Sequence, residues 1–113
     1  MQTVLHCSSG RRSDWRHALG NVENLLADET LDLTDIELLC NGDAVSLATA
    51  DAALADRVDD LLARDVRVCV CRNSLDTRPS VENRLIAGVE RVPSGVGELT
   101  KRQTEGYAYI RVP

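Results

Sequence analysis

Short, uninterrupted apolar runs alternate along this chain with longer segments in which apolar residues recur at helical spacing. The runs at residues 3–7, 35–40 and 67–71 have the length and composition of buried strands. Residues 14–28 and 51–64 carry apolar residues on one helical face, so each predicts a helix between two strands. This alternation is typical of an α/β fold in which a mostly parallel sheet is covered by helices on both faces.

The second half of the chain continues the same pattern. It predicts a short helix at 80–87, a fourth strand at 88–93, a helix from Ser94 to about Gly106 and a last strand at 107–112. In the last helix we expect Val96, Leu99 and Gln103 to face the core. A chain of 113 residues without repeats or linkers is expected to form one domain, residues 1–113, with a five-stranded sheet.

Cys71 is the strongest candidate for a functional residue. It closes the third predicted strand, and the polar residues Arg72, Asn73 and Ser74 follow at once. Ligands of open α/β sheets bind at the carboxyl ends of the strands. Helical amides after Cys71 and the adjacent Arg72 cation would favour its thiolate, the form that is reactive in sulfur transfer or disulfide exchange. We therefore predict Cys71 as the catalytic thiol, with Arg72, Asn73 and Ser74 as binding residues beside it.

The other cysteines and a histidine are weaker candidates. Cys7 and Cys40 end the first and second strands, so parallel strands would bring them to the same sheet edge as Cys71, but a free cysteine is often only a small buried hydrophobe. Cys69 lies two residues back on the Cys71 face and reads as core. His6 is either a core histidine or a base near the pocket. We retain Cys7, Cys40 and His6 as candidate binding residues.

No cofactor or metal is expected from these motifs. The only close cysteine pair, Cys69-x-Cys71, lacks the Cys-x-x-Cys spacing of structural zinc sites. The loop at residues 8–12, Ser-Ser-Gly-Arg-Arg, has neither the glycine pattern of a dinucleotide site nor a Walker lysine. It is either a solvated loop or a place where two arginines attract an anion.

Charge and hydropathy restrict the partners. A net charge of −5 argues against general nucleic-acid binding, which needs a basic surface. No stretch is long and apolar enough to span a membrane, and the first residues do not resemble a signal peptide, so we expect a cytoplasmic protein with reduced cysteines. The Asp-rich composition with a single lysine, Lys101, is typical of halophilic proteins, although a GC-rich genome also favours Arg over Lys.

Several stretches of the chain form a recognisable set. They are Cys71-x-Asn73-Ser74-Leu75, the stretch 88–99, Gln103-x-x-Gly106-Tyr107-x-Tyr109-Ile110, and His6, Asn21 and Asn24. Together they resemble the DsrE/DsrF-like (YchN-type) family. The resemblance implies a three-layer α/β/α domain, homo-oligomers such as trimers or hexamers, and a role in intracellular sulfur oxidation or sulfur relay. It also implies that Cys71 is the family's thiol and carries a persulfide.

Two functions therefore remain open. In the first, the Cys71 thiolate accepts sulfur from a donor protein and passes it to an acceptor protein, which needs one acidified, accessible thiol and little else. In the second, the chain is a non-catalytic oligomeric module that binds a small ligand or a partner protein at the carboxyl edge of the sheet.

Overall fold

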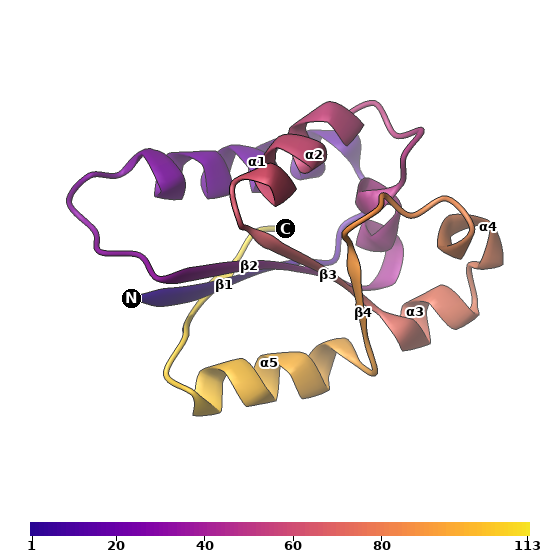
Figure 1. The fold of residues 1–113 in the computed structure, drawn as a ribbon. Helices are drawn as coiled ribbons and strands as arrows, with labels where there is room; N and C mark the ends of the chain where they lie inside the picture. Colours follow the sequence, from indigo (N-terminus) through magenta and orange to yellow (C-terminus); the bar gives the residue numbers. More distant parts are fainter.

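The computed structural model describes all residues from Met1 to Pro113 and has the predicted alternation of strands and helices (Figure 1). None of its helices has the length and apolarity needed to cross a bilayer. The elements in chain order are β1 (Gln2–Cys7), α1 (Arg12–Ala27), β2 (Asp35–Cys40), the 3-10 helix η1 (Gly42–Ala48), α2 (Ala55–Ala63), β3 (Arg67–Cys71), α3 (Arg72–Asp76), α4 (Pro79–Glu82), β4 (Glu90–Val92), α5 (Gly95–Thr104) and β5 (Ala108–Arg111).

All five strands are parallel and lie in the order β4-β3-β2-β1-β5. The first four strands are added in one direction across the sheet, and α5 then carries the chain back to the far side of β1. Figure 1 shows α1 and α2 on one face of the sheet, α5 on the other, and α3 and α4 beyond the carboxyl end of β3. The predicted α/β class and the three-layer arrangement are thus confirmed.

The two faces of the sheet bury side chains of different kinds. The larger core fills the space under α1 and α2, with Leu19, Leu38 and Leu61 fully buried. The core under α5 is small and consists of Val4, Leu39, Cys69, Val92 and Tyr107, with Leu99 packed against it. Successive side chains of a strand point to opposite faces, so Cys7 and Cys40 enter the larger core whereas Cys69 and Cys71 face α5.

The segments after β2 and β3 differ from the prediction. Residues 42–48 form η1, in which Ala44, Val45, Leu47 and Ala48 bury their side chains, whereas no element was expected there from the sequence. The helix predicted at 80–87 is replaced by α3, which begins directly after β3, and by the single turn α4. Pro79 stands in the first turn of α4. Because a residue before proline avoids the helical conformation, Arg78 separates α3 from α4.

The predicted inward face of α5 is wrong. Val96 is 71% exposed and Gln103 is also exposed, whereas Glu98 is buried and Arg102 lies against the sheet. Leu99 alone of the three predicted residues packs inward. The helix turns a partly polar face inward because the strands beneath it offer charged partners, which hydropathy spacing alone cannot reveal.

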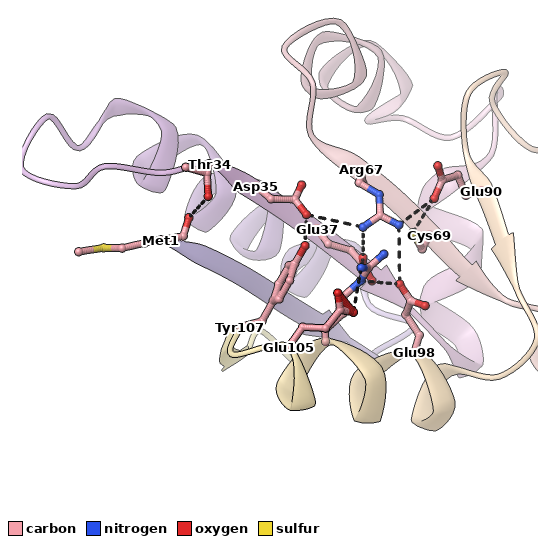
Figure 2. Close-up of polar contacts among 11 residues, drawn as sticks. Met1, Thr34, Asp35, Glu37, Arg67, Cys69, Glu90, Glu98, Glu105 and Tyr107 are labelled. Atoms are coloured by element: carbon pink, nitrogen blue, oxygen red, sulfur yellow. Dashed lines mark hydrogen bonds and ion pairs between the residues drawn. The ribbon is translucent and has the colours of Figure 1, made fainter.

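Glu37 on β2, Arg67 on β3, and Glu98 and Arg102 on α5 bond one another in a largely buried group, called here the carboxylate–arginine cluster. Figure 2 shows Glu37, Arg67 and Glu98 of this cluster. Glu37 is fully buried, and its Oε1 accepts hydrogen bonds from Arg67 Nη1 at 2.7 Å and Arg102 Nε at 2.9 Å. Arg102 Nε also lies 3.1 Å from Glu98 Oε2. The cluster therefore ties α5 to two neighbouring strands.

The second oxygen of Glu37 explains how two carboxyl groups share this site. No N–H or O–H group donates to Oε2. Burial, together with the hydrogen bond and charge of the adjacent Glu98, raises the pKa of Glu37 to about 7, against the lowering effect of the two arginines. Burial would also raise the pKa of Glu98, but the bond from Glu37 and the charge of Arg102 lower it. Below neutral pH a protonated Glu37 donates to an ionised Glu98.

We expect the stability of the protein to fall as the pH rises from 5 to 8. The folded pKa of Glu37 lies above its unfolded value, so its contribution is complete below the unfolded pKa and is lost as the pH rises through about 7. The effect should be on the order of 2 kcal/mol. Glu37→Gln keeps a donor for Glu98 without a titrating proton, so its unfolding free energy in urea should be flatter over this range.

Glu90→Gln is the matched control, because Glu90 also contacts Arg67, at 3.2 Å, but from an exposed position. This variant should keep the wild-type pH dependence. Equal slopes for Glu37→Gln and the wild type would show that Glu37 does not hold the proton.

Candidate functional site

Cys71 lies where β3 ends and two helices begin. It is the residue before α3, and it also lies beside Gly95, the first residue of α5. Only 6% of the residue is exposed, so the thiol lies just beneath the surface. The strand-end position predicted from the sequence is the one that the structure shows.

Hydrogen-bond donors surround the Cys71 sulfur. Burial by itself would raise the pKa of this thiol, but the Ser74 hydroxyl and the backbone amides of Ser74, Gly95 and Asn73 outweigh it and lower the pKa below its ordinary value. Gly42 N donates to Ser74 Oγ at 2.8 Å, which occupies an acceptor site of that hydroxyl and leaves its proton for the sulfur. The site therefore favours the thiolate more than the surroundings of an ordinary cysteine do.

Of the three residues predicted beside Cys71, Asn73 and Ser74 donate to its sulfur, whereas the Arg72 side chain points away. Asn73 contributes its backbone amide, and Ser74 contributes both its amide and its hydroxyl. The Arg72 guanidinium points elsewhere, with Nη1 3.7 Å from Glu82 Oε1, and it is not among the groups that shift the Cys71 pKa most. The thiolate is favoured mainly by neutral donors.

The structure does not bring the other cysteines to Cys71. Cys7 and Cys40 are partners in register on β1 and β2, but they point into the larger core on the opposite face of the sheet. Burial raises the pKa of both thiols, and Cys7 Sγ donates to the Pro113 carbonyl at 3.4 Å. Burial also raises the pKa of Cys69, which donates to Glu90. All four thiols are free, and only that of Cys71 has a lowered pKa.

His6 lies on the same face as Cys71 and is engaged on both nitrogens. Its Nε2 lies 2.9 Å from Asn41 Oδ1, and its Nδ1 lies 2.8 Å from the Tyr109 hydroxyl. Burial lowers the His6 pKa, and the nearby Arg111 lowers it as well, against the bond to Asn41. His6 is thus a neutral ring whose two nitrogens are both hydrogen-bonded, and neither is available to act as a general base.

Sequence reasoning missed Asn41 and Tyr109 as members of this site. Asn41 directly follows β2, the position after a strand end that singled out Arg72, Asn73 and Ser74, and this signal could have identified it. Tyr109 comes from β5, which lies beside β1 although the two strands are about a hundred residues apart in the chain. Only the strand order makes Tyr109 a neighbour of His6.

One further set of potential metal ligands lies in the carboxylate–arginine cluster. Donor atoms of Glu37, Cys69 and Glu98 lie within 4.8 Å of one another. Arg67 and Arg102 already bond the carboxylates, and the Cys69 thiol holds its proton because burial and the nearby Glu37 charge raise its pKa. These side chains are therefore better suited to holding a proton and two guanidinium groups than to binding a metal ion.

A parallel three-layer α/β domain with one acidified thiol at its carboxyl edge is the class of protein that this fold and site define. The DsrE/DsrF-like family model matches residues 5–112, and the chain belongs to that family. A protein of unknown function from Methanobacterium thermoautotrophicum, MTH1491, is 34% identical, with 97% of each chain covered and a TM-score of 0.89.

A second solved structure shares the fold at lower identity. The ychN protein from E. coli is 23% identical, with a TM-score of 0.79 over 98% of this chain and 99% of its own. No curated protein matches the sequence. The family resemblance noted from the sequence is thereby confirmed.

Cys71 should be the thiol that reacts first with iodoacetamide in the folded protein. Peptide mapping after limited alkylation at neutral pH should locate the label there, and Cys71→Ser should remove the fast phase while Cys69→Ser retains it. The midpoint of the rate against pH should lie below about 8.5, the ordinary value for a cysteine. Ser74→Ala should raise that midpoint, because the sulfur loses a donor. Faster labelling of Cys69 would contradict the assignment.

Proposed function

We propose that this protein is a sulfur-relay protein that carries sulfane sulfur as a persulfide on Cys71. The observation that supports the proposal most directly is the set of four hydrogen-bond donors around the Cys71 sulfur, which lowers its pKa in a chain whose other three thiols have raised pKa values. Membership in the DsrE/DsrF-like family supports the same class of chemistry.

The relay consists of two exchanges of the same kind. The Cys71 thiolate attacks the outer sulfur of a donor persulfide, R–S–S–H. A new S–S bond forms at Cys71 while the donor S–S bond breaks, and the donor leaves as the thiolate R–S⁻. The thiolate of an acceptor then attacks the outer sulfur on Cys71, which returns as a thiolate. No external oxidant or reductant is consumed, because each S–S bond formed replaces one that is broken.

The surroundings of Cys71 suit a partner that brings only a thin reactive group. None of the cavities in the structure is lined by Cys71. With 6% of the residue exposed, the sulfur can be reached by a persulfide or thiol projecting from another molecule, whereas an extended substrate finds no enclosing pocket. We therefore propose protein or small-thiol donors and acceptors, in a reducing cytoplasm that keeps the four cysteines free.

Incubation with a persulfide or polysulfide donor, followed by intact mass measurement, tests the relay. The wild type should gain the mass of one sulfur atom, Cys71→Ser should gain none, and Cys69→Ser should behave as the wild type. A thiol acceptor should remove the added sulfur. If the wild type gains no sulfur from any donor, the alternative remains, a non-catalytic module that binds a ligand or partner at the same sheet edge.

We also propose that the chain assembles into a homo-oligomer. The edge strand β5 leaves Tyr109 39% and Ile110 41% exposed, and Val96 on α5 is 71% exposed. Apolar side chains on a free strand edge favour burial against another subunit. Light scattering at micromolar concentration should give a mass that is a multiple of 12.4 kDa, with a trimer or hexamer expected from the family resemblance. Tyr109→Asp with Ile110→Asp should lower that mass, and a wild-type monomer would contradict the proposal.

A further inference from the structure

Asn41 directly follows β2, the strand next to β3, and is the neighbour of Cys71 across these two strands. Cys40 on β2 is in register with Val70 on β3, so the residues that follow them, Asn41 and Cys71, are neighbours. Asn41 has an extended backbone, with φ −133° and ψ 172°. The alternation of β2 therefore turns its side chain to the face of Leu39, which is also the face of Cys71.

The amide of Asn41 has a defined orientation. Its Oδ1 accepts a hydrogen bond from His6, so His6 carries its proton on Nε2. In a neutral ring Nδ1 is then an acceptor, and the Tyr109 hydroxyl donates to it. This chain from Tyr109 through His6 leaves Asn41 Nδ2 directed away from β1, and no group of the protein accepts a hydrogen bond from Nδ2.

Gly95 lies against both Asn41 and the Cys71 sulfur. The position that a Cβ would take on Gly95 lies 3.3 Å from both Nδ2 and Cβ of Asn41, tighter than ordinary van der Waals contact. The backbone amide of this same glycine donates to the Cys71 sulfur. The absent side chain at residue 95 therefore allows an unpartnered side-chain donor to lie beside the donors that already hold Cys71.

A persulfide on Cys71 would place its negative charge beyond the existing hydrogen-bond donors, so its stabilisation calls for a further donor. Its negative charge lies on the outer sulfur, about 2.05 Å beyond the sulfur of the cysteine. The amides of Asn73, Ser74 and Gly95 and the Ser74 hydroxyl are directed at the inner sulfur. A group that stabilises the outer sulfur must lie beside these donors and still have a free N–H.

We propose that Asn41 is a positioning residue for the carried sulfur: its Nδ2 donates to the outer sulfur of a persulfide on Cys71, in an orientation set by His6 and Tyr109. This inference rests on the proposed relay function. It assigns a role to the hydrogen-bonded chain that connects the exposed edge strand β5 with the thiol.

The position of Asn41 is tested on the thiol alone, without any sulfur donor. Asn41→Asp preserves size and the acceptor for His6 but replaces the N–H donor with a carboxylate. A like charge next to the sulfur should raise the midpoint of Cys71 alkylation by about one pH unit. Asn21→Asp makes the same charge change on α1, which covers the opposite face, and should leave the midpoint unchanged. An unshifted midpoint in folded Asn41→Asp would overturn the inference.

The role of Asn41 is tested on the persulfide. Asn41→Ala should leave the thiol midpoint close to that of the wild type, because the four donors to the inner sulfur remain. In the loaded protein, the midpoint for alkylation of the outer sulfur should rise by at least about half a pH unit, since its anion loses a charge-assisted hydrogen bond. Tyr109→Phe should shift the same midpoint in the same direction by less, because Asn41 is then held less firmly. Circular dichroism verifies that each variant is folded.

The outcomes separate this inference from the function on which it rests. A wild type that takes up no sulfur refutes the relay and this inference together. A wild type that loads sulfur, with an Asn41→Ala persulfide that titrates as the wild-type persulfide does, refutes the role of Asn41 alone. Equal upward shifts of the thiol and persulfide midpoints in Asn41→Ala would also refute it, because Asn41 would then act on the inner sulfur.

Discussion

Helix α5 is held to its face of the sheet by the carboxylate–arginine cluster as well as by a few apolar side chains. Glu98 and Arg102 of α5 meet Glu37 and Arg67 of two adjacent strands, with Glu37 fully buried. Removing one partner from such a buried set leaves an uncompensated charge, which is costly. The cluster therefore fixes the rotation of α5 about its axis and its position along the sheet. As a result, Gly95, the first residue of α5, lies beside Cys71.

The acidity of Cys71 is consequently a property of helix placement. Burial of the thiol opposes ionisation, and the amide of Gly95 is among the donors that reverse this effect. Since α5 and Cys71 come from separate parts of the chain, a change in the cluster can alter the thiol without touching it. Glu37 titrates near neutral pH and bonds Glu98, which lies one turn of α5 from Gly95. The protonation of the interior is thereby connected to the same helix.

The sequence was sufficient to predict the parallel sheet, the end of β3 at Cys71 and the place of Ser74 beside it. Local patterns carry this information, because a buried strand is a short apolar run and a polar turn marks its end. The same patterns misplaced part of the inward face of α5, since they predicted Val96 and Gln103 to face the core, where Glu98 and Arg102 lie instead. A charged residue can be predicted to lie in the core only when its partner is known. Glu37, the partner of Glu98 and Arg102, lies about sixty residues before them in the chain.

The role of each cysteine separates what the sequence determined from what the tertiary structure decided. The succession of strands along the chain and the position of Cys7, Cys40 and Cys71 at the carboxyl ends of three of them follow from the sequence. The sequence singled out Cys71, but the groups that set the four thiols apart came only from the fold, because the pleat sends Cys7 and Cys40 into the apolar core and Cys71 toward two helix starts. Likewise, Arg72 adjoins Cys71 in sequence but bonds Glu82, while Gly95, Asn41 and Tyr109 approach from distant segments. The pKa of a thiol depends on the donors that surround it in space, and only the folded chain brings those donors together.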